Sequence, residues 1–130
     1  MITLAIDPGP LKSGYVLIRN NNIIAFGKES LAEIKKIYLD NRPDRILIEI
    51  TDWPVPLAGE SYRDTNIVIG RMLEFFRCIC LTIGRAEARN HFHLKNDSDV
   101  IKFLRQQNIK LKTDAWQAYL LYHYYETYGA

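Results

Sequence analysis

Short apolar segments separated by turn-forming residues recur along the chain. Each is four to six residues long and most are rich in β-branched side chains, which is typical of buried strands. The pattern predicts strands at residues 2–6, 14–18, 23–26, 45–50 and 78–83. Asn20, Asn21 and Asn22 separate the second and third segments, and Asn tolerates the positive φ angles of a tight hairpin turn. The first three strands are therefore expected to form an antiparallel meander.

Apolar positions spaced three and four residues apart predict helices between and after the later strands. Ser30 and Glu33 form a capping box before the first helix, and Pro43 follows its end. We expect helices at residues 31–41, 65–77, 97–107 and 113–128, and a long loop at residues 51–64. This order predicts an α/β fold, with a mixed five-stranded sheet and helices on both faces. The 130 residues are expected to form one domain.

Two carboxylates stand near the ends of predicted buried strands. Asp7 follows the first strand, and Glu49 lies inside the apolar run at residues 45–50. A carboxylate in such a run is costly unless it is paired or binds a metal. If the two strands are parallel and adjacent, both side chains emerge at the end of the sheet where α/β proteins place their sites. Taken alone, Asp7 could simply start a turn, and Glu49 could form a salt bridge with an arginine.

Asp114 begins the last predicted helix, a position that helix capping alone would explain. Together with Asp7 and Glu49, however, it makes an oxygen-rich set suited to Mg²⁺. Two such ions about 3.5–4 Å apart can activate a water and stabilise the leaving oxygen in phosphodiester hydrolysis. The three carboxylates are therefore our candidate catalytic residues and metal ligands.

The net charge of +2 identifies no partner, but its distribution is uneven. Residues 61–95 hold six basic and three acidic side chains, a net charge of +3. Such an excess is typical of a surface that faces a polyanion, although an ordinary solvated surface has the same pattern. The candidate phosphate contacts are Lys12, Arg63, Arg71, Arg85, Arg89 and Lys95.

The apolar runs and the cysteines bear on the compartment. The longest apolar runs are far shorter than the ~20 residues needed to cross a bilayer. The first residues lack the basic and apolar blocks of a secretory signal. Cys78 and Cys80 lie one residue apart in an apolar segment and form no disulfide framework. We therefore expect a cytoplasmic protein with no membrane partner.

Three segments, in order and at suitable spacing, resemble the RuvC-type Holliday junction resolvases. Residues 4–15, LAIDPGPLKSGY, are similar to the family's opening: an apolar strand, Asp-Pro-Gly, a short loop and Gly-Tyr. Residues 46–49, ILIE, are similar to its second acidic strand, and residues 113–118, TDAWQA, resemble its last motif. The element order is that of the RNase H-like fold, and the short chain resembles the phage and prophage members.

This resemblance implies a single nuclease domain over residues 1–130 that cleaves branched DNA, such as a four-way junction, in recombination and repair. It implies Asp7, Glu49 and Asp114 as ligands of Mg²⁺, for which Mn²⁺ could substitute. It also implies that Trp53 or Tyr62 stacks on an unpaired base, an interaction worth about 1–3 kcal/mol. Packing of their loop on the body of the protein is the alternative.

The resemblance also implies a homodimer, because four-way junctions are two-fold symmetric. The helix at residues 65–77, where the family dimerises, carries more apolar residues than one core-facing stripe requires: Ile67, Val68, Met72, Phe75 and Phe76. We expect a second subunit to cover part of this helix.

One position departs from the family pattern. The family usually has another Asp or a His three residues before its last Asp, and here that residue is Leu111. This favours a non-catalytic protein of the same fold that binds junctions or other nucleic acids. A nuclease of this fold acting on RNA or on RNA–DNA hybrids is a further alternative. An actin-like or sugar-kinase-like ATPase also has Asp and Gly after a strand, but that class needs two such domains.

Overall fold

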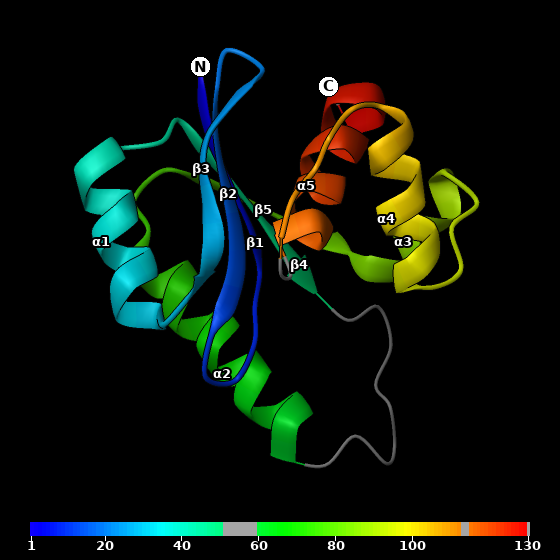
Figure 1. Cartoon of the computed structure of the whole chain (residues 1–130). Helices are drawn as coiled ribbons and strands as arrows, with labels where there is room; N and C mark the ends of the chain where they lie inside the picture. The colour runs from blue at the N-terminus through cyan, green and yellow to red at the C-terminus, as the bar shows by residue number, and fades with distance from the viewer. Residues whose placement is uncertain (51–59, 113–114, 130) are drawn as a thin grey trace.

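This computed structural model describes residues 1–50, 60–112 and 115–129. Its sheet has five strands, whose arrangement can be followed in Figure 1. In chain order they are β1 (Ile2–Asp7), β2 (Ser13–Arg19), β3 (Asn22–Glu29), β4 (Arg45–Ile50) and β5 (Ile79–Gly84). Their spatial order is β3-β2-β1-β4-β5. The first three pair antiparallel, and β4 pairs parallel with both β1 and β5. The predicted meander and mixed five-stranded sheet are confirmed.

Helices cover both faces of the sheet, as predicted (Figure 1). One face carries α1 (Leu31–Asn41) and α2 (Glu60–Phe75). The other, which we call the α3–α5 face, carries α3 (Arg85–His91), α4 (Asp97–Gln106) and α5 (Ala115–Tyr124). A π-helical turn, Tyr125–Gly129, continues α5. Within the described ranges, no helix has the length and apolar content needed to cross a membrane.

Local signals in the sequence set several element boundaries. Asn20 and Asn21, in the turn between β2 and β3, adopt φ angles of 50° and 68°, which Asn accepts at little cost. Ser30 caps α1, because its side chain accepts a hydrogen bond from the Glu33 amide at 3.3 Å. At the other end Arg42, with φ of 45°, closes the helix before Pro43.

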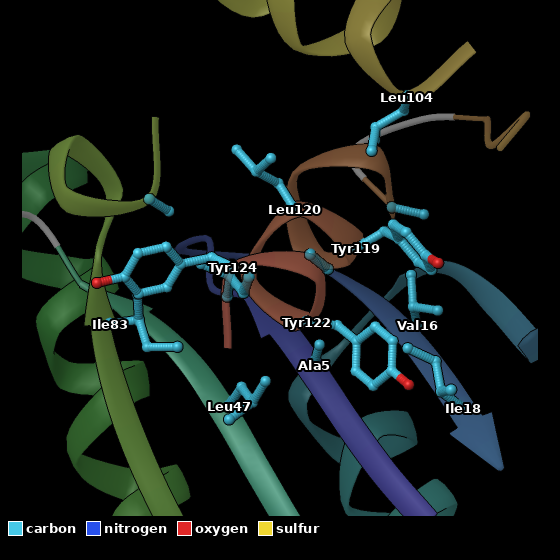
Figure 2. Close-up of a cluster of buried hydrophobic side chains, with 14 of the residues drawn as sticks. Ala5, Val16, Ile18, Leu47, Ile83, Leu104, Tyr119, Leu120, Tyr122 and Tyr124 are labelled. Atoms are coloured by element: carbon cyan, nitrogen blue, oxygen red, sulfur yellow. The ribbon is translucent and has the colours of Figure 1, made fainter. Parts of the chain in front are cut away.

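The alternation of side chains along the central strands divides the core into two layers. In β1 and β4, Leu4, Ile6, Ile46 and Ile48 pack toward α1 and α2. Ala5 and Leu47, at the intervening positions, pack toward the α3–α5 face. Figure 2 shows this second layer, in which Ala5 and Leu47 belong to one cluster with aromatic side chains of α5. The alternation therefore also decides on which face of the sheet the side chain of a residue at a strand end lies.

The main differences from the sequence prediction concern three helices. Helix α2 begins at Glu60 rather than at residue 65, so Tyr62 and Arg63 are helical and the predicted loop is too long. Its first turn is polar but free of Pro and Gly, so the helix extends beyond its apolar stripe. Helix α3 was not predicted, because it buries only Ala88 and has no apolar period. The last helix, expected to run to residue 128, changes to π geometry at Tyr125.

Candidate active site

Asp7 and Glu49 lie side by side at the carboxyl ends of β1 and β4. The register pairs Ile6 with Ile48, so Asp7 and Glu49 occupy the next positions of two adjacent parallel strands. They alternate in phase with Ala5 and Leu47, which places both carboxylates on the α3–α5 face. The expectation that these strands are parallel and adjacent is confirmed. We call Asp7 and Glu49 the acidic pair.

Arg85 connects the two carboxylates of the acidic pair. It is the first residue of α3, directly after Gly84 at the end of β5. Its Nε donates a hydrogen bond to Glu49 Oε1, and its Nη2 lies 3.4 Å from Asp7 Oδ1. The charges of both carboxylates outweigh the effect of burial and raise the pKa of Arg85. One positive charge therefore balances part of the negative charge here.

Glu49 is buried, with 5 % of its side chain exposed. Burial raises its pKa above the ordinary value, an effect that Arg85, Gln117 and Arg89 oppose. Its second oxygen, Oε2, is inaccessible to solvent and has no hydrogen-bond partner among the described residues. An unpartnered buried carboxylate oxygen is costly. A cation ligated by Glu49 would compensate that cost.

Gln117 and Arg89 lie behind Glu49 and support it. Gln117, in α5, is fully buried, and its Oε1 accepts hydrogen bonds from Arg89 Nε at 3.3 Å and Nη2 at 2.9 Å. Arg89 Nη2 also donates to Asp97 Oδ1 at 2.7 Å. The Gln117 amide favours the charged form of Glu49, although its Nε2 makes no hydrogen bond of normal geometry with described residues. Helices α3, α4 and α5 thus all contribute to the support of Glu49.

The turn after β1 is compact around Gly9. A β-carbon on Gly9 would lie 2.3 Å from the Lys12 carbonyl oxygen, so only glycine fits this close approach. The Gly9 amide also donates to Ser13 Oγ at 3.3 Å. This packing explains the glycine of the Asp-Pro-Gly sequence and leaves the Lys12 side chain exposed beside the end of β1.

The remaining candidate residues fall into three groups. Asp114 and Trp53 lie outside the described residues, so the third carboxylate and one stacking candidate stay predictions. Exposed side chains, available to a polyanion, are those of Lys12, Arg63, Arg71, Arg85 and Lys95, and Tyr62 is half-buried on α2. The side chain of Arg89 is only 11 % exposed and contacts Gln117 and Asp97, which favours a supporting role. Among the described residues, no three acidic, His or Cys side chains cluster as metal ligands.

The alternative that Glu49 forms a salt bridge with an arginine is confirmed, and the arginine is Arg85. Two features of the site were not predicted: the Gln117 support and the second contact of Arg85, to Asp7. Gln117 had a recognisable signal, because it is a single amide inside the apolar and aromatic run of residues 115–122. A polar residue at a core position is more informative than an apolar residue at the surface. Arg85 had no local signal, because its partners lie 36 and 78 residues away.

The sheet order, the two helical layers and the acidic pair define an α/β protein with an RNase H-like fold. Among solved structures, the chain is similar to the Thermus thermophilus RuvC structure, with a TM-score of 0.75 and 13 % identity over 99 % of this chain and 97 % of that one. It is also similar to T. thermophilus RuvC in complex with a Holliday junction substrate, with a TM-score of 0.68, 14 % identity and the same coverage. The chain therefore has a RuvC-like fold along nearly its whole length. Neither a protein-family model nor a curated protein matches the sequence.

Proposed function

We propose that this protein is a metal-dependent endonuclease for branched DNA, a Holliday junction resolvase. The observation that carries the proposal is the acidic pair at the carboxyl ends of β1 and β4. It lies in a fold that is similar to the T. thermophilus RuvC structure over 97 % of that chain. The similar RuvC structure in complex with a Holliday junction substrate supports branched DNA as the ligand.

The residues of the site fit a divalent cation. Asp7 and Glu49 offer the carboxylate oxygens that Mg²⁺ prefers, and Mn²⁺ accepts the same ligands. Buried Glu49 Oε2 has no hydrogen-bond partner among the described residues, which independently supports a missing positive partner. Asp114, which precedes α5, would complete the set. When bound, such cations lower the pKa of a ligated water and stabilise the charge of the leaving oxygen.

The chain's own residues would bind and orient the DNA. Exposed Lys12 lies in the turn that follows Asp7, and Arg63 and Arg71 lie on α2. Contacts from such side chains to phosphates fix the register of a duplex without reading its sequence. Tyr62, also on α2, is the described aromatic candidate for stacking on an unpaired base.

A homodimer through α2 is part of this proposal. Val68, Met72 and Phe76 are buried in the chain's own core, so the apolar excess of this helix is smaller than the sequence indicated. Ile67 and Leu73, however, are 47 % and 44 % exposed. Gly70 lies between them with open space around its α-carbon, which permits close approach of a second backbone. A dimer would place two acidic pairs on one two-fold symmetric junction.

Leu111 favours a second candidate, a non-catalytic junction-binding protein. Leu111 is partly buried against the core of the α3–α5 face, so it serves packing where the family usually has a ligand. The first candidate requires that Asp7, Glu49 and Asp114 suffice for activity.

Cleavage assays distinguish these functions. A four-way junction, an RNA–DNA hybrid and a linear duplex should be incubated side by side, with and without Mg²⁺. A resolvase cuts the junction in preference to the other two and only with the metal. Cleavage of the hybrid instead would indicate the RNA-directed alternative. Metal-independent binding of the junction without any cleavage would support the non-catalytic protein.

A further inference from the structure

We propose that Arg85 is a displaceable counter-ion of the acidic pair. Its guanidinium holds Asp7 and Glu49 when no divalent cation is bound, and it must leave them before a cation can bind both. This inference rests on the metal site proposed above and adds to it an internal competitor of the metal.

The contacts of Arg85 carry the first step. Arg85 Nε donates a hydrogen bond to Glu49 Oε1, and Nη2 lies 3.4 Å from Asp7 Oδ1. One guanidinium therefore contacts both carboxylates. A cation bridging the acidic pair would need oxygens that face the same space. The guanidinium and a divalent cation would then stand within a few ångströms of one another and repel strongly. The two therefore exclude each other from the acidic pair.

The exposure of the three side chains carries the second step. Glu49 is 5 % and Asp7 11 % exposed, whereas Arg85 is 49 % exposed. The carboxylates are held by their strands, but the long arginine side chain borders solvent and can turn into it. Arg85 is therefore the member of the group that can move when a cation arrives.

The unpartnered oxygen of Glu49 carries the third step. Arg85 contacts Oε1, while buried Oε2 has no hydrogen-bond partner in the described part of the chain. Among the described residues, the Arg85 guanidinium thus satisfies Glu49 only in part, and a divalent cation would be the stronger partner of this carboxylate. The arrangement suits a counter-ion that keeps the metal-free site folded and yields to the metal.

A purely structural role of Arg85 would have the opposite effect on metal binding. If Arg85 only shaped the site, its removal would disturb the carboxylates and weaken metal affinity. If it competes with the metal, its removal should tighten metal affinity while lowering the stability of the metal-free protein. The sign of the change in affinity therefore separates the two roles.

The test is calorimetric titration of the full chain with Mn²⁺ in the absence of DNA. Arg85→Gln should bind Mn²⁺ about tenfold more tightly than wild type, because a nearby half-exposed positive charge is gone. Arg85→Lys, which keeps the charge, should stay closer to wild type. The control is Arg19→Gln, an equal charge change at an exposed residue of β2. Arg19 pairs with Ile2, at the other end of β1 from Asp7, and its loss should leave affinity unchanged.

Thermal melts in EDTA and in Mn²⁺ give a second readout of the same proteins. Arg85→Gln should melt below wild type in EDTA and gain more than wild type from Mn²⁺. If Arg85→Gln binds Mn²⁺ no more tightly than wild type does, this inference is overturned. If wild type nevertheless cleaves junctions, the proposed function stays intact. If neither wild type nor Arg85→Gln binds Mn²⁺, the metal site of the proposed function fails as well.

Wild-type protein supplies a measurement that does not depend on the folding of a variant. The Nε–H proton of Arg85, identified by its absence from Arg85→Lys spectra, should exchange slowly with water in EDTA because it is bonded to Glu49. Saturating Mg²⁺ should make its exchange fast. Protection that persists at saturating Mg²⁺ would contradict displacement.

Discussion

Gln117 turns its amide nitrogen away from Arg89, because its Oε1 accepts both hydrogen bonds that Arg89 donates to it. The amide nitrogen is buried and lies close enough to Glu49 for this side chain to favour the charged carboxylate. If the amide were flipped, its NH₂ group would face the donors of Arg89. Arg89 therefore fixes which end of Gln117 faces Glu49.

This relationship predicts that Gln117 positions Glu49 for the proposed reaction. Gln117→Leu keeps the volume but removes the acceptor of Arg89 and the dipole beside Glu49. We expect cleavage to fall by about tenfold or more, as is usual when a partner of a metal ligand is lost, and stability by about 1–3 kcal/mol. Cleavage rate and denaturant unfolding measure the two effects. Gln106→Leu, at an exposed residue of α4, should change neither, and wild-type cleavage by Gln117→Leu would refute the role.

Replacing Asp7 tests catalysis directly. Asp7→Asn keeps the shape but removes the charge on one of two adjacent strand ends, so the proposed cation loses a ligand. We expect cleavage to be abolished and junction binding to be equal or tighter, since a negative charge facing the phosphates is gone. Gel-shift and cleavage assays measure the two quantities. Asp40→Asn, on an exposed residue of α1, is the matched control; equal cleavage by wild type and Asp7→Asn would favour the non-catalytic protein.

The exposed arginines of α2 should govern DNA affinity. Charge reversal of Arg63 and Arg71 should weaken junction binding without unfolding the domain, because both side chains project into solvent. The dependence of affinity on salt should also become less steep, because fewer counterions are released on binding. Arg89 is a poor choice for this experiment, since its reversal would break the contacts to Gln117 and Asp97. Affinity measured across salt concentrations checks this, and unchanged affinity would place the DNA on another face.

The proposed dimer predicts a change in mass. Wild type should scatter light with about twice the 15.1 kDa of one chain. Replacing Ile67 and Leu73 with Glu should reduce the scattering mass to that of one chain, because both side chains are exposed on α2. Leu39→Glu, at a residue 52 % exposed on α1, should leave the dimer intact. A wild-type mass near 15.1 kDa at working concentration would contradict the dimer.

The fold could be predicted from the sequence where local signals and periodicity agreed. The Asn turn, the cap at Ser30 and the apolar runs of β1 and β4 are each encoded within a few residues, and these elements form as expected. Helix α3 escaped prediction because seven residues with one buried side chain carry no period. Its position matters, since it brings Arg85 and Arg89 to the acidic pair.

From the sequence, only the part of the site that lies at the ends of predicted strands could be identified. Asp7 and Glu49 were identifiable because a carboxylate after or within an apolar strand needs a partner. The identity of that partner depends on contacts between residues far apart in the sequence, and Arg85 could not be assigned to it beforehand. Leu111 shows the same limit, because its packing against the core is a property of the tertiary structure.

His123 makes the stability of the α3–α5 face sensitive to mild acid. Its ring lies among aromatic neighbours, with centroids 5.1 Å from Phe92 and 5.5 Å from Phe103. Burial, and then the nearby charge of His91, lower the pKa of His123 below its ordinary value of 6.5. At a pH between the lowered pKa of His123 in the folded protein and its ordinary pKa in the unfolded chain, the unfolded chain binds more protons. The free energy of unfolding therefore falls as the pH drops below 6.5.

The variant His123→Phe should remove most of this loss, because it keeps an aromatic ring against Phe92 and Phe103 and cannot be protonated. Denaturant unfolding at pH 7.5 and 5.5, a range above the titration of ordinary carboxylates, measures the effect. His93→Asn is the matched control: His93 is exposed and has a φ of 59°, a conformation that Asn tolerates, so it should keep the wild-type pH dependence. An equal loss of stability in wild type and His123→Phe would show that another group titrates.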